Sequence, residues 1–105
     1  MNQPIRQGDV YLIPATIPAN ATPVPRDGGR VVLAYGEVTG HSHAIAAPAA
    51  EQFEADNARF LRIVGVLDVD LAHEEHSTIA VAPGEWLVIA PREWTRDLGE
   101  RLVLD

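Results

Sequence analysis

The stretch Arg30-Val31-Val32-Leu33-Ala34-Tyr35-Gly36-Glu37-Val38-Thr39-Gly40-His41-Ser42-His43 joins an apolar run to two of the four histidines in the chain. Apolar side chains occupy both alternating faces of residues 30–38, which predicts a central strand buried on both sides. If the extended conformation continues past Gly36 and Gly40, one face carries a polar stripe of Glu37, Thr39, His41 and His43. The two glycines instead favour a bulge or bend. Such a bend would change which side chains share a face and would let the backbone approach a ligand closely.

On both sides of this stretch, proline, glycine and the Asp56-Asn57 pair divide the chain into short extended runs. The regular alternation in residues 66–71 predicts the most distinct of these strands, with Leu67, Val69 and Leu71 facing inward. A helical period is weak everywhere, and its best example covers residues 48–58. The expected strands are residues 9–13, 30–38, 51–54, 59–64, 66–71, 77–81, 85–90 and 101–104.

This pattern predicts an all-β fold, a small sandwich or barrel of short, mostly antiparallel strands, with cupin-like and jelly-roll arrangements included. The chain of 105 residues can form one hydrophobic core, so we expect a single domain over residues 1–105. Four prolines in residues 14–29 predict an extended, polyproline-like connection, which could be a functional loop or a plain surface link.

Composition excludes several classes of protein. No apolar stretch approaches the roughly 20 residues of a membrane helix, and the start at Met1 shows no secretory signal, so we expect a cytoplasmic protein without a membrane partner. The formal net charge of −7 disfavours a nucleic-acid partner, because phosphate backbones repel such a chain. Without cysteine there is no thiolate site, so imidazole, carboxylate, carbonyl or water must bind any metal.

The histidines form two close pairs, an HxH and an HxxH. His41 and His43, two apart on a strand, would face the same way at about 6.5 to 7 Å along it. His73 and His76, three apart, can face the same way across one turn. Because two such pairs usually build a metal site or an acid–base dyad when they meet, we expect them to converge on a divalent zinc, nickel, iron or copper ion.

Glu74 and Glu75 lie between the second pair of histidines. Either could be a ligand, an acceptor that fixes an imidazole tautomer, or a general base, and they are the catalytic candidates if the protein is a metal-dependent hydrolase. Three imidazoles and a water would fit hydrolytic or redox chemistry, whereas four imidazoles would close a structural or sensory site. The spacing is not that of the HExxH zinc proteases.

Two other functions remain open. One is a non-enzymatic interaction or assembly module whose histidines form hydrogen bonds across an interface, which predicts pH-dependent assembly and no response to chelators. The other is metal-free acid–base catalysis on a phosphodiester by opposed imidazoles, against which the acidic charge and the absence of lysine count. We expect the metal-binding domain to be a homo-oligomer, because a small core leaves apolar strand edges to cover.

The large aromatic residues Trp86, Trp94 and Tyr35 could line a ligand pocket. Packing in the core or at an interface is the more common use of such side chains, and it is the use that we expect.

Several distinctive segments lie along most of the sequence: the opening Gln7-Gly8-Asp9-Val10, the segments 36–43 and 73–76, and a proline-glycine turn followed by Arg92-Glu93-Trp94. In these segments the chain resembles a family of small, uncharacterised bacterial and phage-associated proteins. The resemblance implies a complete domain and carries no mechanism. The HxH pair with a later proline-glycine turn is also similar to cupins, but the acid that cupins place after HxH is absent from residues 44–48, so the likeness concerns architecture alone.

Overall fold

The computed structural model describes residues 2–36 and 40–90, and in these residues all regular structure is β. This confirms the predicted all-β class. The ten strands are β1 (Ile5–Gln7), β2 (Val10–Pro14), β3 (Thr22–Val24), β4 (Val31–Tyr35), β5 (Ser42–Ile45), β6 (Ala50–Ala55), β7 (Ala58–Ile63), β8 (Val69–Leu71), β9 (Ile79–Val81) and β10 (Gly84–Ile89).

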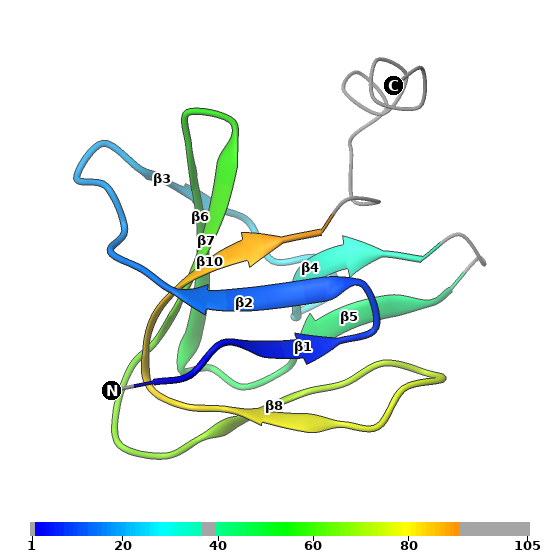
Figure 1. Cartoon of the computed structure of the whole chain (residues 1–105). Helices are drawn as coiled ribbons and strands as arrows, with labels where there is room; N and C mark the ends of the chain where they lie inside the picture. The colour runs from blue at the N-terminus through cyan, green and yellow to red at the C-terminus, as the bar shows by residue number, and fades with distance from the viewer. Residues whose placement is uncertain (1, 37–39, 91–105) are drawn as a thin grey trace.

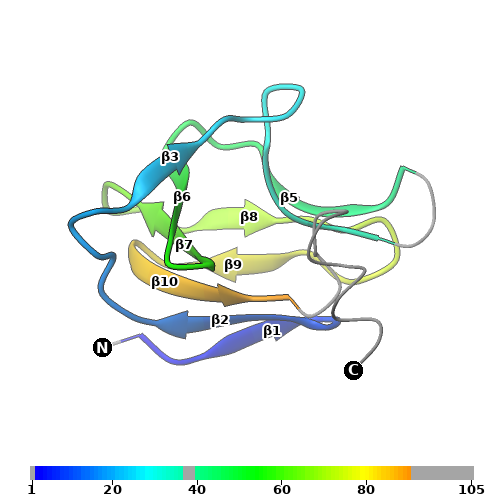
Figure 2. The same cartoon turned by 90° about the horizontal axis from the view of Figure 1, so that it is seen from above.

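The strands pair antiparallel in three sheets. Six strands form one sheet in the order β1-β2-β10-β7-β6-β3, and the hairpins β4-β5 and β8-β9 form the other two. Ala44 and Ala72 join the hairpins by exchanging two backbone hydrogen bonds of 3.0 and 2.9 Å. Figures 1 and 2 together place β1, β2 and β10 opposite β4 and β5, with β8 and β9 beneath them.

The hydrophobic core lies between the large sheet and the two hairpins. Its buried side chains come from β2, β6, β7 and β10 of the sheet and from all four hairpin strands. Trp86 on β10 is fully buried among them, and its indole N–H donates to the carbonyl of Ala82 at 3.1 Å. Core packing is thus confirmed for Trp86, whereas Tyr35 at the end of β4 is exposed. Trp94 lies outside the described residues.

The central stretch reverses direction instead of continuing as one strand. β4 pairs antiparallel with β5, and the Gly36 N–H donates to the His41 carbonyl at 2.9 Å across the ends of the two strands. The expected polar stripe along a single strand is therefore wrong, and Glu37 and Thr39 lie outside the described residues. The expected bend is confirmed at Gly40, whose φ of 88° suits glycine. A separate irregularity in the pairing falls between Val32 and Ala34.

Two other expectations need correction. Residues 14–29 are not only a connection, because they include β3, which pairs with β6. Pro23 is tolerated in β3 because an edge strand pairs on one side only, so a residue without a backbone N–H can face the unpaired side. The strand expected at residues 66–71 shrinks to β8, and Leu67, predicted to face inward, is 76% exposed beside a 90% exposed Val66. Alternation of residue types alone did not reveal that Gly65, with a φ of 90°, begins a loop.

The other short strands lie where turn residues predicted them. Asp56 and Asn57 both have positive φ, as a tight two-residue hairpin turn requires, and they join β6 to β7. The weak helical period over residues 48–58 is overridden by β6. The strand expected at residues 101–104 lies outside the described residues. Within residues 2–36 and 40–90, no helix is long and apolar enough to cross a bilayer.

Candidate metal centre

The four histidines meet, as the two close pairs predicted. His73 is at the centre of the cluster: its ring centroid lies 5.8 Å from that of His41, 4.3 Å from that of His43 and 4.7 Å from that of His76. The backbone bridge explains this convergence, because Ala44 directly follows His43 and Ala72 directly precedes His73. Hydrogen bonds between these two alanines fix His43 on β5, and His41 just before this strand, beside the loop that follows β8.

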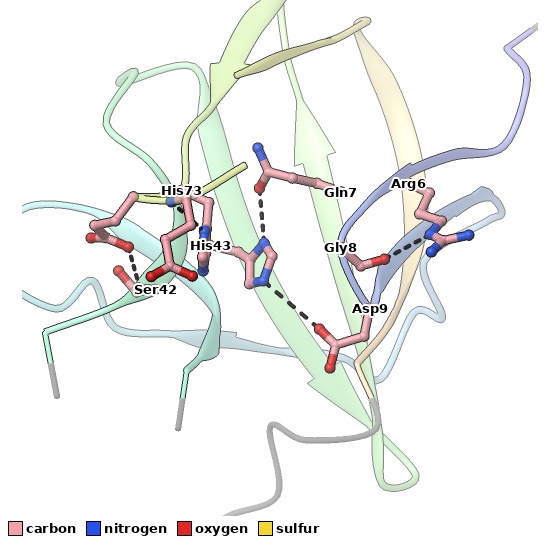
Figure 3. A network of polar contacts seen from close by, with 9 residues as sticks. Arg6, Gln7, Gly8, Asp9, Ser42, His43 and His73 are labelled. Carbon is pink, nitrogen blue, oxygen red and sulfur yellow. Dashed lines mark hydrogen bonds and ion pairs between the residues drawn. The ribbon is translucent and has the colours of Figure 1, made fainter. Parts of the chain in front are cut away.

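Gln7 on β1 determines which nitrogen of His43 carries a proton. Gln7 is 3% and His43 4% exposed, so their polar atoms must be satisfied inside the protein. The Gln7 amide nitrogen donates to the carbonyls of Leu71 at 2.8 Å and Ser77 at 2.9 Å, which identifies the side-chain oxygen as an acceptor. His43 Nδ1 lies 2.8 Å from that oxygen and therefore donates to it, so His43 Nε2 keeps a lone pair (Figure 3).

The environment of His43 keeps its ring neutral. The pKa of His43 is lowered from 6.5 to about 4, mainly by burial and also by the neighbouring His73 and His76, while Asp9 acts in the opposite direction. Asp9 Oδ1 lies 3.8 Å from His43 Nε2 (Figure 3). Because a neutral ring with a proton on Nδ1 has none on Nε2, this contact brings two acceptors together and is not an ion pair.

His41, His73 and Glu74 form a group that could hold a metal ion. One ligand atom from each lies within 4.8 Å of the others. Glu74 Oε1 accepts a 2.9 Å hydrogen bond from the Ser42 N–H, which, with its own backbone N–H and the nearby His41 and His73, lowers the pKa of Glu74. His41 Nδ1 lies 3.8 Å from Glu75 Oε2. Glu74 is thus an ionised carboxylate that the Ser42 backbone N–H orients. Glu75 lies where it can orient His41.

One hydrogen bond competes with a metal at His73. The Glu75 N–H donates to His73 Nδ1 at 3.0 Å, so the proton of the neutral ring is on Nε2. An ion that binds either nitrogen has to replace this bond. A hydrogen bond of this kind contributes about 0.5 to 1.5 kcal/mol net, whereas apparent binding energies of structural zinc sites are about 10 to 16 kcal/mol. The bond therefore sets the resting tautomer of His73 without preventing metal binding.

Gly8 makes room for His76. A Cβ atom added at Gly8 would lie 2.6 Å from His76 Nε2, and Gly8 has a φ of 60°. The imidazole of His76 therefore packs directly on the backbone of the turn between β1 and β2. Glycine suits this position because of its positive φ, and the end of the His76 side chain occupies the space where a Cβ atom would lie.

We expect Gly8→Ala to destabilise the fold by more than the ~1 to 2 kcal/mol that a left-handed residue costs, because the new methyl group also displaces His76. Gly28→Ala is the matched control: Gly28 has a φ of 61°, and an added Cβ would meet nothing within 4 Å. Urea denaturation of both variants measures the difference. Equal losses of stability would show that His76 does not pack on Gly8.

The histidine cluster opens into a cleft of about 410 Å³. Three of the four histidines border it, and His41 does not, so the cluster has a cleft side and an outer side. Gly8, Asp9, Tyr35, His43, His73 and His76 are among the residues that line this cleft.

Sequence reasoning missed Gln7 and Asp9 as site residues. Gln7 precedes the first expected strand, residues 9–13, and Asp9 begins it; an isolated glutamine carries no chemical signature. The available signal is the Gln7-Gly8-Asp9-Val10 opening, which the sequence connects to function only through the family resemblance. In the structure this opening supplies a positioning amide, a glycine beneath His76 and a carboxylate in the cleft.

The comparisons with known proteins give a family without an assigned function. Residues 6–90 match the family described as Domain of unknown function (DUF8820). The matched range includes all four histidines, Gln7 and Glu74. No curated protein and no solved structure matched the chain.

Proposed function

The chain belongs to the DUF8820 family, and we propose that it is a metal-binding β-domain in which His41, His73 and Glu74 hold a divalent transition metal. The observation that carries this proposal is the approach of one ligand atom from each of these residues to within 4.8 Å of the others. Bonds of about 2.0 to 2.2 Å to a tetrahedral ion need a slightly tighter arrangement. Small rotations of the exposed Glu74 and of the half-buried histidines supply it.

The donor set limits the metal and its chemistry. Two imidazoles and one carboxylate are the ligands of open zinc sites and of non-haem iron(II) sites. This donor set favours zinc or iron over nickel and copper. Such a set leaves a position for water, so a hydrolytic role fits better than a closed structural one. Glu75, beside His41, remains a candidate general base, and the binding of one ion by all four histidines remains a prediction.

Elemental analysis of protein purified without an affinity tag tests this proposal. After dialysis against a trace of zinc, we expect the protein to retain at least about one equivalent of a transition metal. His41→Ala and Glu74→Gln, both outside the core, should lose this ion while their denaturation midpoints in the absence of metal stay near that of the wild type. Metal retained by both variants, or absent from the wild type, would refute the proposal.

An assembly module is the second candidate. Val66 and Leu67, between β7 and β8, are 90% and 76% exposed, which is unusual for adjacent aliphatic side chains and is consistent with a protein partner or a homo-oligomer. This candidate predicts assembly that is insensitive to chelators. Size-exclusion chromatography with and without EDTA separates the two. A cytoplasmic location remains a proposal from the sequence.

A further inference from the structure

We propose that the cleft beside the histidines binds a small organic oxyanion, a phosphate or a carboxylate, whose charged group Arg6 holds at the mouth of the cleft. The cleft volume of about 410 Å³ is within the range of small-ligand sites, roughly 300 to 1,000 Å³. His41 and Glu74 do not line this cleft, and the proposal requires no metal ion. It can therefore fail separately from the metal centre.

The first step of the argument is the position of Arg6. Arg6 on β1 and Tyr11 on β2 are direct partners in the antiparallel pairing of these strands, and both line the cleft. The guanidinium carbon of Arg6 lies 5.4 Å from the centre of the Tyr11 ring, and Arg6 Nε donates to the Gly8 carbonyl at 2.7 Å (Figure 3). These two contacts hold the side chain in place, so a ligand that binds it loses less conformational entropy.

The second step is the far end of the guanidinium. Within residues 2–36 and 40–90, neither Nη atom of Arg6 has a hydrogen bond or an ion pair. Arg26, by contrast, donates to four carbonyls, and Arg62 pairs with two carboxylates. The parallel N–H groups of a guanidinium can bind two oxygens of one carboxylate or phosphate. The Nη atoms of Arg6 are therefore suited to an oxyanion.

The third step is the separation of opposite charges in the cleft. Asp9 points toward His43, with 3.8 Å between Asp9 Oδ1 and His43 Nε2, and Arg6 lies on the other side of Gly8 (Figure 3). Asp9 also has a further interaction within the protein. Its carboxylate repels an anion near the histidines, so the oxyanion binds at the Arg6 end. In a chain with a formal net charge of −7, an anion needs such a local cation.

The remaining walls of the cleft suit the uncharged part of a ligand. Tyr11 and Tyr35 are 38% and 53% exposed, and both border the cleft together with Ala34 and Ala90. The Tyr35 hydroxyl donates to Asp27, which holds this ring in place. Aromatic rings offer a large apolar contact area, and ligand sites commonly combine such rings with a few polar groups. A ring attached to the oxyanion would contact these walls.

NMR titration of the isotope-labelled, metal-free chain with phenyl phosphate and, separately, with benzoate tests the proposal. We expect saturable shifts of the Gly8 and Tyr11 amide signals with at least one probe, and the probe that binds more tightly identifies the oxyanion. Neutral benzyl alcohol should bind at least about tenfold more weakly, because it cannot form hydrogen bonds with an ionised acceptor. Since no metal is present, the result does not depend on the metal centre.

Arg6→Gln should weaken binding of the better probe at least about tenfold. Arg30→Gln is the matched control, because Arg30 is another exposed arginine but does not line the cleft, and it should keep the wild-type affinity. The same spectra show whether each variant is folded. Arg6→Lys is a second variant, which keeps the charge without the paired N–H groups, and its affinity should fall between those of wild type and Arg6→Gln.

Three results would overturn the proposal. The first is the absence of saturable shifts with both probes. The second is an equal affinity for benzyl alcohol and the better probe, which would show that the charge of the ligand is not recognised. The third is the same affinity in Arg6→Gln as in Arg30→Gln, whether unchanged or weakened, because either case would show that Arg6 does not hold the oxyanion.

Discussion

Replacement of His73 by alanine is expected to weaken zinc binding at the Glu74 site by at least about 100-fold. Loss of an outer contact to a ligand already costs about 10- to 100-fold in metal affinity, so loss of a direct ligand should cost at least the upper value. His73 is also the only ring in contact with all three other histidines. Competition with a chromophoric chelator measures the affinity.

Ser77→Ala is the control for this substitution. Ser77 has an exposed side chain in the same loop, and its contact with Gln7 uses the backbone carbonyl, which the substitution keeps. The control should bind zinc as the wild type does. An affinity of His73→Ala within a few-fold of the control would contradict the assignment of His73 as a ligand.

The metal-free protein is expected to lose about 3 kcal/mol of its free energy of unfolding as the pH falls from 6.5 to 4. Folding lowers the pKa of His43 from 6.5 to about 4, so between these values the unfolded chain binds a proton that the folded chain does not. Stability therefore rises with pH across this window. Each pKa unit corresponds to about 1.36 kcal/mol, which gives the stated magnitude.

Urea denaturation at several pH values, with EDTA present, checks this expectation against His43→Gln, whose side chain does not titrate. The variant should lose the slope that His43 contributes between pH 6.5 and 4.5. The lowered pKa of Glu74 acts in the same direction, but only as the pH falls below its usual 4.5. The same slope in wild type and variant would show that His43 is not the group responsible.

The sequence allowed the β class and the meeting of the histidines to be predicted, because both follow from local signals. Proline, glycine and Asp-Asn turns separate short apolar runs, and these runs became strands such as β2, β7 and β10. All histidines lie in two tight pairs, so a shared site was the simplest arrangement. The bridge between Ala44 and Ala72 that brings the pairs together has no signature in the sequence.

The features that could not be predicted depend on tertiary contacts. Leu67 has the right phase for a buried strand position, yet the loop that begins at Gly65 leaves it exposed. The role of Gln7 depends on two carbonyls more than sixty residues away in the chain, at Leu71 and Ser77. Likewise, the grouping of Glu74 with His41 and His73 requires the Ser42 N–H, a backbone donor that any residue would supply.

X-ray absorption spectroscopy of the untagged protein loaded with one equivalent of zinc tests the central claim most directly. The account predicts a first shell of nitrogen and oxygen atoms at about 2.0 to 2.1 Å, with the outer-shell scattering of imidazole rings. That imidazole scattering should diminish in His73→Ala. A spectrum of hydrated zinc without imidazole scattering would contradict the claim that this histidine cluster is a metal site.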